Sequence, residues 1–164
     1  MAGNHPTTVT RTTQVLGVLL ALGAVAAVLS VFLEDSLIRS WAEHNPSVRE
    51  TFEQGGLDAV KDSPVQIPAF APVAVVLFVV IAGLALVLLA FVRIGHLWAR
   101  TCLAVLVAFT ALGTIAGLRT DPPGLYVAFA AVSLVIEVVL VYFLFHRDTT
   151  AFLREADRSG TPVD

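Results

Sequence analysis

The sequence contains few of the residues from which most catalytic and metal sites are built. Charged residues make up 14% of the 164 residues, there is one cysteine, and the four histidines are far apart. A single cysteine, Cys102, excludes an intramolecular disulfide and a Cys-rich zinc or iron–sulfur site. The net charge of −3 also lacks the basic excess that nucleic-acid binding requires. We therefore expect no metal, no cofactor and no nucleic-acid partner.

Apolar residues, in contrast, are in large excess. They make up 57% of the chain, and the mean hydropathy is +0.83, whereas an average soluble domain is about 45–50% apolar. A soluble domain of this size buries only about 70% of the surface that its unfolded chain exposes. This composition therefore excludes an ordinary soluble fold and indicates a membrane protein with several spans.

Four apolar runs, bounded by charged residues, are long enough to cross a membrane. They cover residues 12–33, 68–92, 101–118 and 125–145, and about 20 helical residues span the hydrocarbon core of a bilayer. Because a backbone in lipid must satisfy its own hydrogen bonds, each run is expected to be a helix. The sequence thus predicts an all-α fold, a transmembrane four-helix up-down bundle with a short helical outer cap between its first two helices.

The first run has a second interpretation, as a secretory signal peptide. The tripeptide Ala24-Val25-Ala26 has the form of a cleavage site at the end of an apolar stretch. The apolar run nevertheless continues to Leu33, which favours a retained transmembrane helix.

Lys and Arg are distributed unequally between the two sides of the predicted bundle. If the N-terminus is inside, six of these residues lie inside and four outside. Because cytoplasmic loops carry the excess of Lys and Arg, we expect a multi-pass protein of the cell (plasma) membrane. Its N-terminal tail, residues 1–11, and C-terminal tail, residues 146–164, are then cytoplasmic.

The outer loop, residues 34–67, contains signals for short helices. Asp35-Ser36 is a candidate cap for a first helix, and Ser47-x-x-Glu50 has the form of a capping box for a second one. The dipeptide Gly55-Gly56 is expected to end that second helix. Together these helices would form an amphipathic cap at the outer mouth of the bundle.

Two aromatic residues lie on the apolar side of this predicted cap. Trp41 and Phe52 are candidates either for packing and interface anchoring or for docking an extracytoplasmic partner.

One ionisable residue, Glu137, lies inside a predicted span. A charged carboxylate at this depth costs at least ~2.5 kcal/mol, so the side chain is expected to face the bundle. Ser133 is one turn earlier on the same face, and Thr110 lies at a similar depth in the preceding span. One interpretation is a neutral carboxyl group hydrogen-bonded to Thr110 or Ser133. The others are a partner for a basic residue of another subunit, a proton or cation relay, and a lipid contact.

The third run contains a small-residue motif, Gly113-x-x-x-Gly117. Small residues at this spacing let two helix backbones approach closely. The motif predicts either packing within the bundle or packing against another chain.

The turn between the second and third runs is rich in residues that favour the membrane–water interface. Its basic and aromatic members are Arg93, His96, Trp98 and Arg100. Trp side chains favour the headgroup level and arginines bind anionic lipid. We therefore expect this turn to contact membrane lipids.

Three features give the chain a family resemblance. An acidic outer loop follows the first run, the stretch Gly95-His96-Leu97-Trp98-Ala99-Arg100 opens the third, and Thr150-Ala151-Phe152-Leu153 follows the fourth. In this order of parts the chain resembles small four-span integral membrane proteins of unknown function from high-GC Gram-positive bacteria. The resemblance implies a bacterial membrane protein and no particular activity.

The sequence carries no catalytic motif of the HExxH, P-loop or GxGxxG kind. We therefore expect a non-enzymatic integral membrane protein, an accessory or scaffold subunit that associates laterally with another membrane protein or with copies of itself. The alternative is a small proton-coupled transporter or a lipid-binding membrane protein that uses Glu137. A lipid-modifying enzyme with its site at the outer mouth is a third hypothesis.

Overall fold

The structure is a computed structural model that describes residues 7–159. The expected tail residues 1–6 and 160–164 lie outside this range. The described part of the chain folds into seven helices: α1 (Thr7–Phe32), α2 (Glu34–His44), α3 (Arg49–Lys61), α4 (Phe70–Ile94), α5 (Leu97–Leu118), α6 (Gly124–Leu144) and α7 (Arg147–Ser159). The predicted all-α fold is therefore confirmed.

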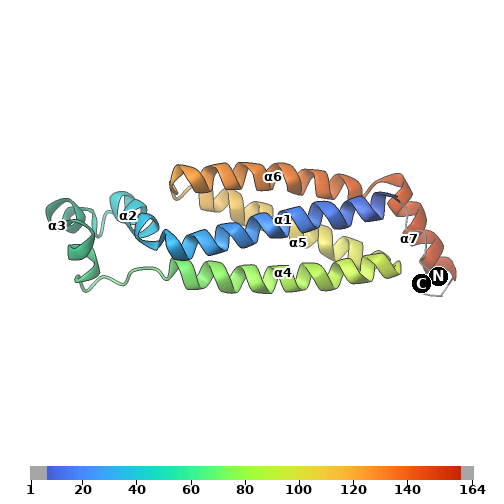
Figure 1. Cartoon of the computed structure of the whole chain (residues 1–164), viewed down its shortest axis with the longest axis horizontal. Helices are drawn as coiled ribbons and strands as arrows, with labels where there is room; N and C mark the ends of the chain where they lie inside the picture. Colours follow the sequence, from blue (N-terminus) through green and yellow to red (C-terminus); the bar gives the residue numbers. More distant parts are fainter. Residues whose placement is uncertain (1–6, 160–164) are drawn as a thin grey trace.

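Four of these helices, α1, α4, α5 and α6, are long and apolar enough to cross a membrane. They lie side by side along the long axis of the molecule (Figure 1). Around the bundle, α1 packs on α4 and α6, and α5 packs on the same two helices from the other side. Every neighbouring pair is antiparallel, which is the up-down arrangement that the sequence predicts.

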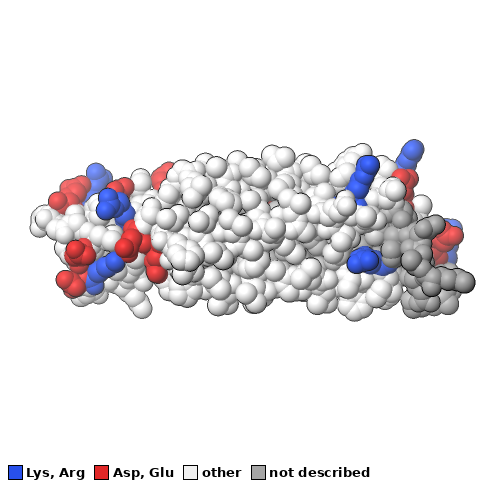
Figure 2. All heavy atoms as spheres, in the orientation of Figure 1, with Lys and Arg blue, Asp and Glu red and all other residues white. Residues whose placement is uncertain are grey.

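The two ends of the bundle carry different elements. The start of α1, the α4–α5 turn and α7 lie at one end, here called the α7 end (Figure 1). The cap, made of α2 and α3, lies at the other, here called the cap end. Lys, Arg, Asp and Glu gather at the two ends, and the middle of the visible face has none of them (Figure 2). This distribution is that of an integral membrane protein.

Two spans begin earlier than predicted, because their arginines lie inside the helices. The guanidinium carbon of Arg11 is 5.9 Å from the ring centre of Phe143, and that of Arg100 is 5.0 Å from the ring centre of Phe145. Arginine covers apolar surface with its stem while its charged head stays near the interface. The helices α1 and α5 therefore continue past Arg11 and Arg100, the charged residues that bound the predicted spans.

The core of the bundle is concentrated toward the α7 end. There Leu153 of α7 packs, fully buried, against the ends of the spans. In α5 and α6 the buried residues all lie on the α7 side of Val107 and Glu137, these two included. The buried members of this core are Leu16, Ala85, Leu88, Leu89, Val92, Ala99, Leu103, Val107, Leu140, Leu144 and Leu153. The packed core thus lies mainly at the α7 end, and Ala27, Ser30 and Ala71 are buried toward the cap end.

The first helix of the cap continues directly from α1. The backbone N–H groups of Ser36 and Leu37 donate to the carbonyl oxygen of Leu33, which is the N-cap residue of α2 and makes no side-chain cap bond. The predicted side-chain cap at Asp35-Ser36 is therefore wrong. Its physical reason is that α2 has no free N-terminus for a side chain to cap.

The second helix of the cap, α3, is kinked. The capping box predicted at its start is wrong, because its N-cap residue is Val48 and the Glu50 carboxylate accepts a hydrogen bond from Gln54 at 3.2 Å instead. Gly56 has φ 67° and ψ −157°, which interrupts the helical backbone. The helical backbone is thus interrupted at the predicted Gly55-Gly56 stop, and one further turn follows it within α3.

The cap has a small hydrophobic core of its own. Val48 and Val60 are fully buried there, and Trp41 and Phe52 pack against them, each half-buried. One hydrogen bond ties the cap to the bundle, from the hydroxyl of Ser40 to the backbone oxygen of Asp121, at 2.7 Å.

Candidate functional site

Glu137 lies in the interior of the bundle, where α6 faces α5. Its residue surface is 5% exposed, and its Oε1 atom lies 3.0 Å from the hydroxyl oxygen of Thr110 on α5. The structure therefore brings together two of the three residues proposed from the sequence as an intramembrane polar site. The second carboxyl oxygen, Oε2, is buried and has no hydrogen-bond partner in the described part of the chain.

The contacts of Thr110 bear on the protonation state of Glu137. The Thr110 hydroxyl lies 2.8 Å from the carbonyl oxygen of Val107 as well as 3.0 Å from Glu137. A hydroxyl has one proton to donate. If Glu137 is ionised, this single Thr110 proton faces two acceptor oxygens and can form a full hydrogen bond with only one of them. A proton on Oε1 satisfies both, because Glu137 then donates to Thr110 while Thr110 donates to Val107. Oε2 is then a pure acceptor.

The neutral form also agrees with the surroundings of the side chain. No other Asp or Glu and no Lys, Arg or His lines the cavity beside Glu137. A charged carboxylate with no cationic partner is costly at this depth of a membrane. We therefore treat Glu137 as a protonated carboxylic acid.

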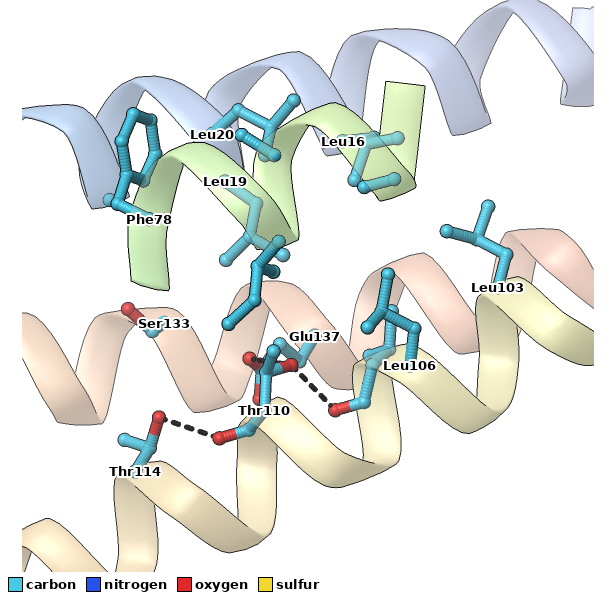
Figure 3. A pocket seen from close by; sticks show the side chains of 15 residues that line it. Leu16, Leu19, Leu20, Phe78, Leu103, Leu106, Thr110, Thr114, Ser133 and Glu137 are labelled. Carbon is cyan, nitrogen blue, oxygen red and sulfur yellow. Dashed lines mark hydrogen bonds between the residues drawn. The ribbon is translucent and has the colours of Figure 1, made fainter. Parts of the chain in front are cut away.

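The carboxyl group borders a cavity of about 180 Å³ between the four spans. Its walls are almost entirely apolar. Figure 3 shows leucines of α1 opposite the Thr110–Glu137 pair, with Phe78 of α4 beside them. The labelled apolar residues of the wall are Leu16, Leu19, Leu20, Phe78, Leu103 and Leu106.

The remaining polar residues of the wall make hydrogen bonds within their own helices. The hydroxyl of Ser133 donates to the backbone oxygen of Phe129 at 2.9 Å, and that of Thr114 donates to the backbone oxygen of Thr110 at 2.9 Å. Ser133 therefore lies in the cavity wall, as the sequence prediction placed it, and its hydroxyl bonds to its own helix. Oε2 of Glu137 remains the polar atom in this wall that lacks a partner.

A second hollow, of about 290 Å³, lies toward the cap end, and Thr114 lines both spaces. The hydroxyl of Tyr126 is buried in this region and has no partner among the described residues. Leu37 of the cap helix α2 contributes to the same wall. Thr114 and Tyr126 thus lie between Glu137 and the cap end. The packed core lies on the other side of Glu137, toward the α7 end.

Tyr126 and the apolar walls of the cavity were not predicted from the sequence. A signal for Tyr126 is present, because Ser133 and Glu137 follow it by 7 and 11 residues, which places all three on one face of α6. The leucines and Phe78 carry no such signal, since they do not differ from the apolar residues that face lipid.

The small-residue motif of α5 makes no close helix contact, and Gly117 borders the hollow at the cap end. A Cβ atom built on Gly113 or Gly117 would meet nothing within 4 Å, and both residues are exposed. Within the bundle these glycines therefore support no close helix contact.

The interface residues of the α4–α5 turn form a small cluster. Trp98 is exposed, and its ring centre lies 5.1 Å from that of Phe91 and 6.2 Å from that of His96. Arg93 is exposed, while Arg100 donates a hydrogen bond to the hydroxyl of Thr150 in α7 at 2.9 Å. The turn is thus tied to α7 at the end of the bundle.

No group of three or more His, Cys, Asp or Glu residues able to hold a metal ion lies within residues 7–159. No protein-family model, no curated protein and no solved structure matches the chain.

Proposed function

We propose that this integral membrane protein binds a small, largely apolar molecule inside its bundle, with Glu137 as its polar contact. The observation that carries the proposal is the unpartnered Oε2 of Glu137, buried in the wall of an apolar cavity. A buried polar atom without a partner costs about 1–3 kcal/mol. A bound molecule that supplies this partner and fills the cavity would offset that cost.

The proposal is tested by filling the cavity. Ala82 lines it from α4, and Ala82→Leu would occupy part of its volume. The matched control is Gly83→Leu on the same helix, because a side chain at Gly83 would meet nothing within 4 Å. The protein is purified in mild detergent, extracted with organic solvent, and the extract is analysed by mass spectrometry.

We expect one small compound to accompany the wild-type protein and the Gly83→Leu variant and to be lost from Ala82→Leu. If Ala82→Leu retains every compound that the control retains, the cavity is not the binding site. If no compound accompanies the wild-type protein and none binds when added, the proposed function is refuted.

A second candidate function is that of an accessory or scaffold subunit that associates laterally through α5. The specific observation that favours it is that Gly113 and Gly117 are exposed and a side chain on either would meet nothing within 4 Å, which leaves room for a partner helix to approach. Gly113→Leu and Gly117→Leu should abolish cross-linking to a partner or to a second copy and leave the melting temperature of the monomer unchanged. Undiminished cross-linking in both variants would refute this role.

The proposal includes an orientation, with the α7 end in the cytoplasm and the bundle in the plasma membrane. Its support is the distribution of the basic residues. Four lie at the cap end and six at the α7 end, the latter being Arg11, Arg93, Arg100, Arg147, Arg154 and Arg158. The cavity would then be approached from the outer side, since the packed core closes the cytoplasmic side.

A further inference from the structure

We propose that the ligand of the Glu137 cavity is a neutral molecule with one hydroxyl group, which donates its proton to Oε2 of Glu137. This inference rests on the proposed function and names the chemical class of its ligand. It excludes ligands whose polar group only accepts hydrogen bonds, such as ketones, esters and ethers.

The requirement for a donor follows from the proton positions around Thr110. The Thr110 hydroxyl lies within hydrogen-bond distance of both the Val107 carbonyl and Oε1 of Glu137. With the carboxyl proton on Oε1 both contacts are satisfied, and the remaining oxygen, Oε2, has lone pairs and no proton. A ligand that contacts Oε2 must therefore bring the proton.

The surroundings argue for a neutral donor. The lining of the cavity holds apolar side chains and three hydroxyl residues besides Glu137 itself. The hydroxyls of Thr110 and Thr114 already donate to backbone oxygens (Figure 3), and so does the hydroxyl of Ser133. An ammonium group would have to leave water and pair with an ionised Glu137, and the desolvation of both ions opposes this. A hydroxyl group makes the same contact at a much lower desolvation cost.

The volume of the cavity sets the size of the ligand. The cavity measures about 180 Å³, and an apolar engineered cavity of about 150 Å³ holds a benzene molecule. A compound with one six-membered ring and one hydroxyl group therefore fits. The hollow at the cap end, which shares Thr114 with the cavity, lies on the approach that such a molecule would take.

The test compares three probes of nearly equal shape on the purified full chain. Cyclohexanol donates and accepts, cyclohexanone only accepts, and methylcyclohexane does neither. We measure the dissociation constant of each by titration calorimetry in detergent, with the Ala82→Leu variant as the blank for partitioning into the micelle. A net hydrogen bond corresponds to about two- to twelvefold in affinity, so we expect cyclohexanol to bind at least about twofold more tightly than the other two.

Two substitutions of Glu137 make the test specific. Gln retains the pattern, since its amide N–H donates to Thr110 and its carbonyl accepts from the ligand, so Glu137→Gln should keep the preference for cyclohexanol. Glu137→Leu removes the acceptor and should make the three affinities equal. Equal affinities in Glu137→Gln, or a preference that survives in Glu137→Leu, would overturn the assignment.

The remaining outcomes separate this inference from the function on which it rests. If cyclohexanone or methylcyclohexane binds as tightly as cyclohexanol in the wild-type protein, and Ala82→Leu abolishes this binding, the cavity binds ligands but the hydroxyl requirement is wrong. The cyclohexylammonium ion is titrated as a fourth probe, and if it binds more tightly than cyclohexanol, the neutral donor is wrong. If no probe binds the wild-type protein better than Ala82→Leu, both the inference and the proposed function fail.

Discussion

The hydroxyl oxygen of Thr110 lies 3.0 Å from Oε1 of Glu137, and this contact joins α5 to α6 in the interior of the bundle. It lies at the boundary between the packed core of the α7 end and the cavity. One carboxyl oxygen is thus used to connect two spans, and the other is left for a ligand. In the proposed function, a carboxyl group inside the membrane thus has both a structural and a binding role.

The structural role of Glu137 predicts a small effect of its removal. Glu137→Gln keeps a donor toward Thr110 and should change the free energy of unfolding by no more than about 0.5 kcal/mol. Glu137→Leu should cost about 0.6 kcal/mol and at most ~2 kcal/mol, because the Thr110 hydroxyl keeps its bond to Val107. Denaturation in detergent measures both variants. A Gln variant destabilised by more than about 2 kcal/mol would indicate that an ionised Glu137 pairs with a cation.

In the α4–α5 turn, we expect one added methyl group to have a larger effect on the free energy of unfolding. Gly95 has φ +104°, and a Cβ atom there would collide with the Cβ of Ala156 in α7. Gly95→Ala should therefore lower the free energy of unfolding by about 1–3 kcal/mol. The matched control is Gly113→Ala, which meets nothing and should leave stability unchanged or raise it by up to about 1 kcal/mol. Equal stabilities of the two variants would contradict this account of the turn.

We expect the stability of the cap to decrease at high pH. The Nζ atom of Lys61 in α3 donates to Asp35 in α2 at 2.7 Å, and this hydrogen bond raises the pKa of Lys61 above its ordinary value of 10.5. When folding raises a pKa, the stabilisation is complete below the unfolded pKa and is lost as pH rises through the folded pKa. The cap should therefore loosen as pH rises above about 10.5.

Fluorescence of Trp41 reports this loosening, because Trp41 packs in the small core of the cap. The second tryptophan of the chain is removed by Trp98→Phe. The control is Lys61→Met in the same background, which should show no step in this pH range. A step of equal size with and without Lys61 would assign the change to another group.

The proposed orientation predicts opposite labelling of the two ends. Glu43 in α2 and Asp157 in α7 are exposed, and each is replaced by cysteine in a Cys102→Ala background. On intact cells an impermeant thiol reagent should label the cysteine at position 43 and should label position 157 only after lysis. Labelling of both positions on intact cells would contradict four spans, and labelling of position 157 alone would invert the orientation.

The spans and the Glu137–Thr110 pair were predictable because a lipid environment restricts both the backbone conformation and the position of a carboxyl group. A long apolar run must form its own backbone hydrogen bonds, and a carboxyl group at this depth must face the interior. Antiparallel spans then place Thr110 and Glu137 at the same level. The choice of Thr110 over Ser133 was not predictable, since a serine hydroxyl in a helix bonds equally well to its own backbone, as it does to Phe129.

The helix limits and the cap depend on contacts between residues that are distant in sequence. Arg100 continues α5 because it reaches Thr150 and the ring of Phe145. The expected caps of α2 and α3 were wrong because they are local rules, and the chain entering α2 is already helical. The cavity depends on how the apolar faces of four helices pack together, and the sequence of a single span does not predict that packing.

The most direct test of the account is the infrared spectrum of the Glu137 carboxyl group at neutral pH. The difference spectrum between the wild-type protein and Glu137→Gln isolates this group. We expect the carbonyl band of a protonated carboxylic acid, and we expect it to move to lower frequency when cyclohexanol is added and to stay unmoved with methylcyclohexane. A carboxylate band in place of the carbonyl band, or a carbonyl band that does not respond to cyclohexanol, would contradict a neutral Glu137 with an oxygen available to a ligand.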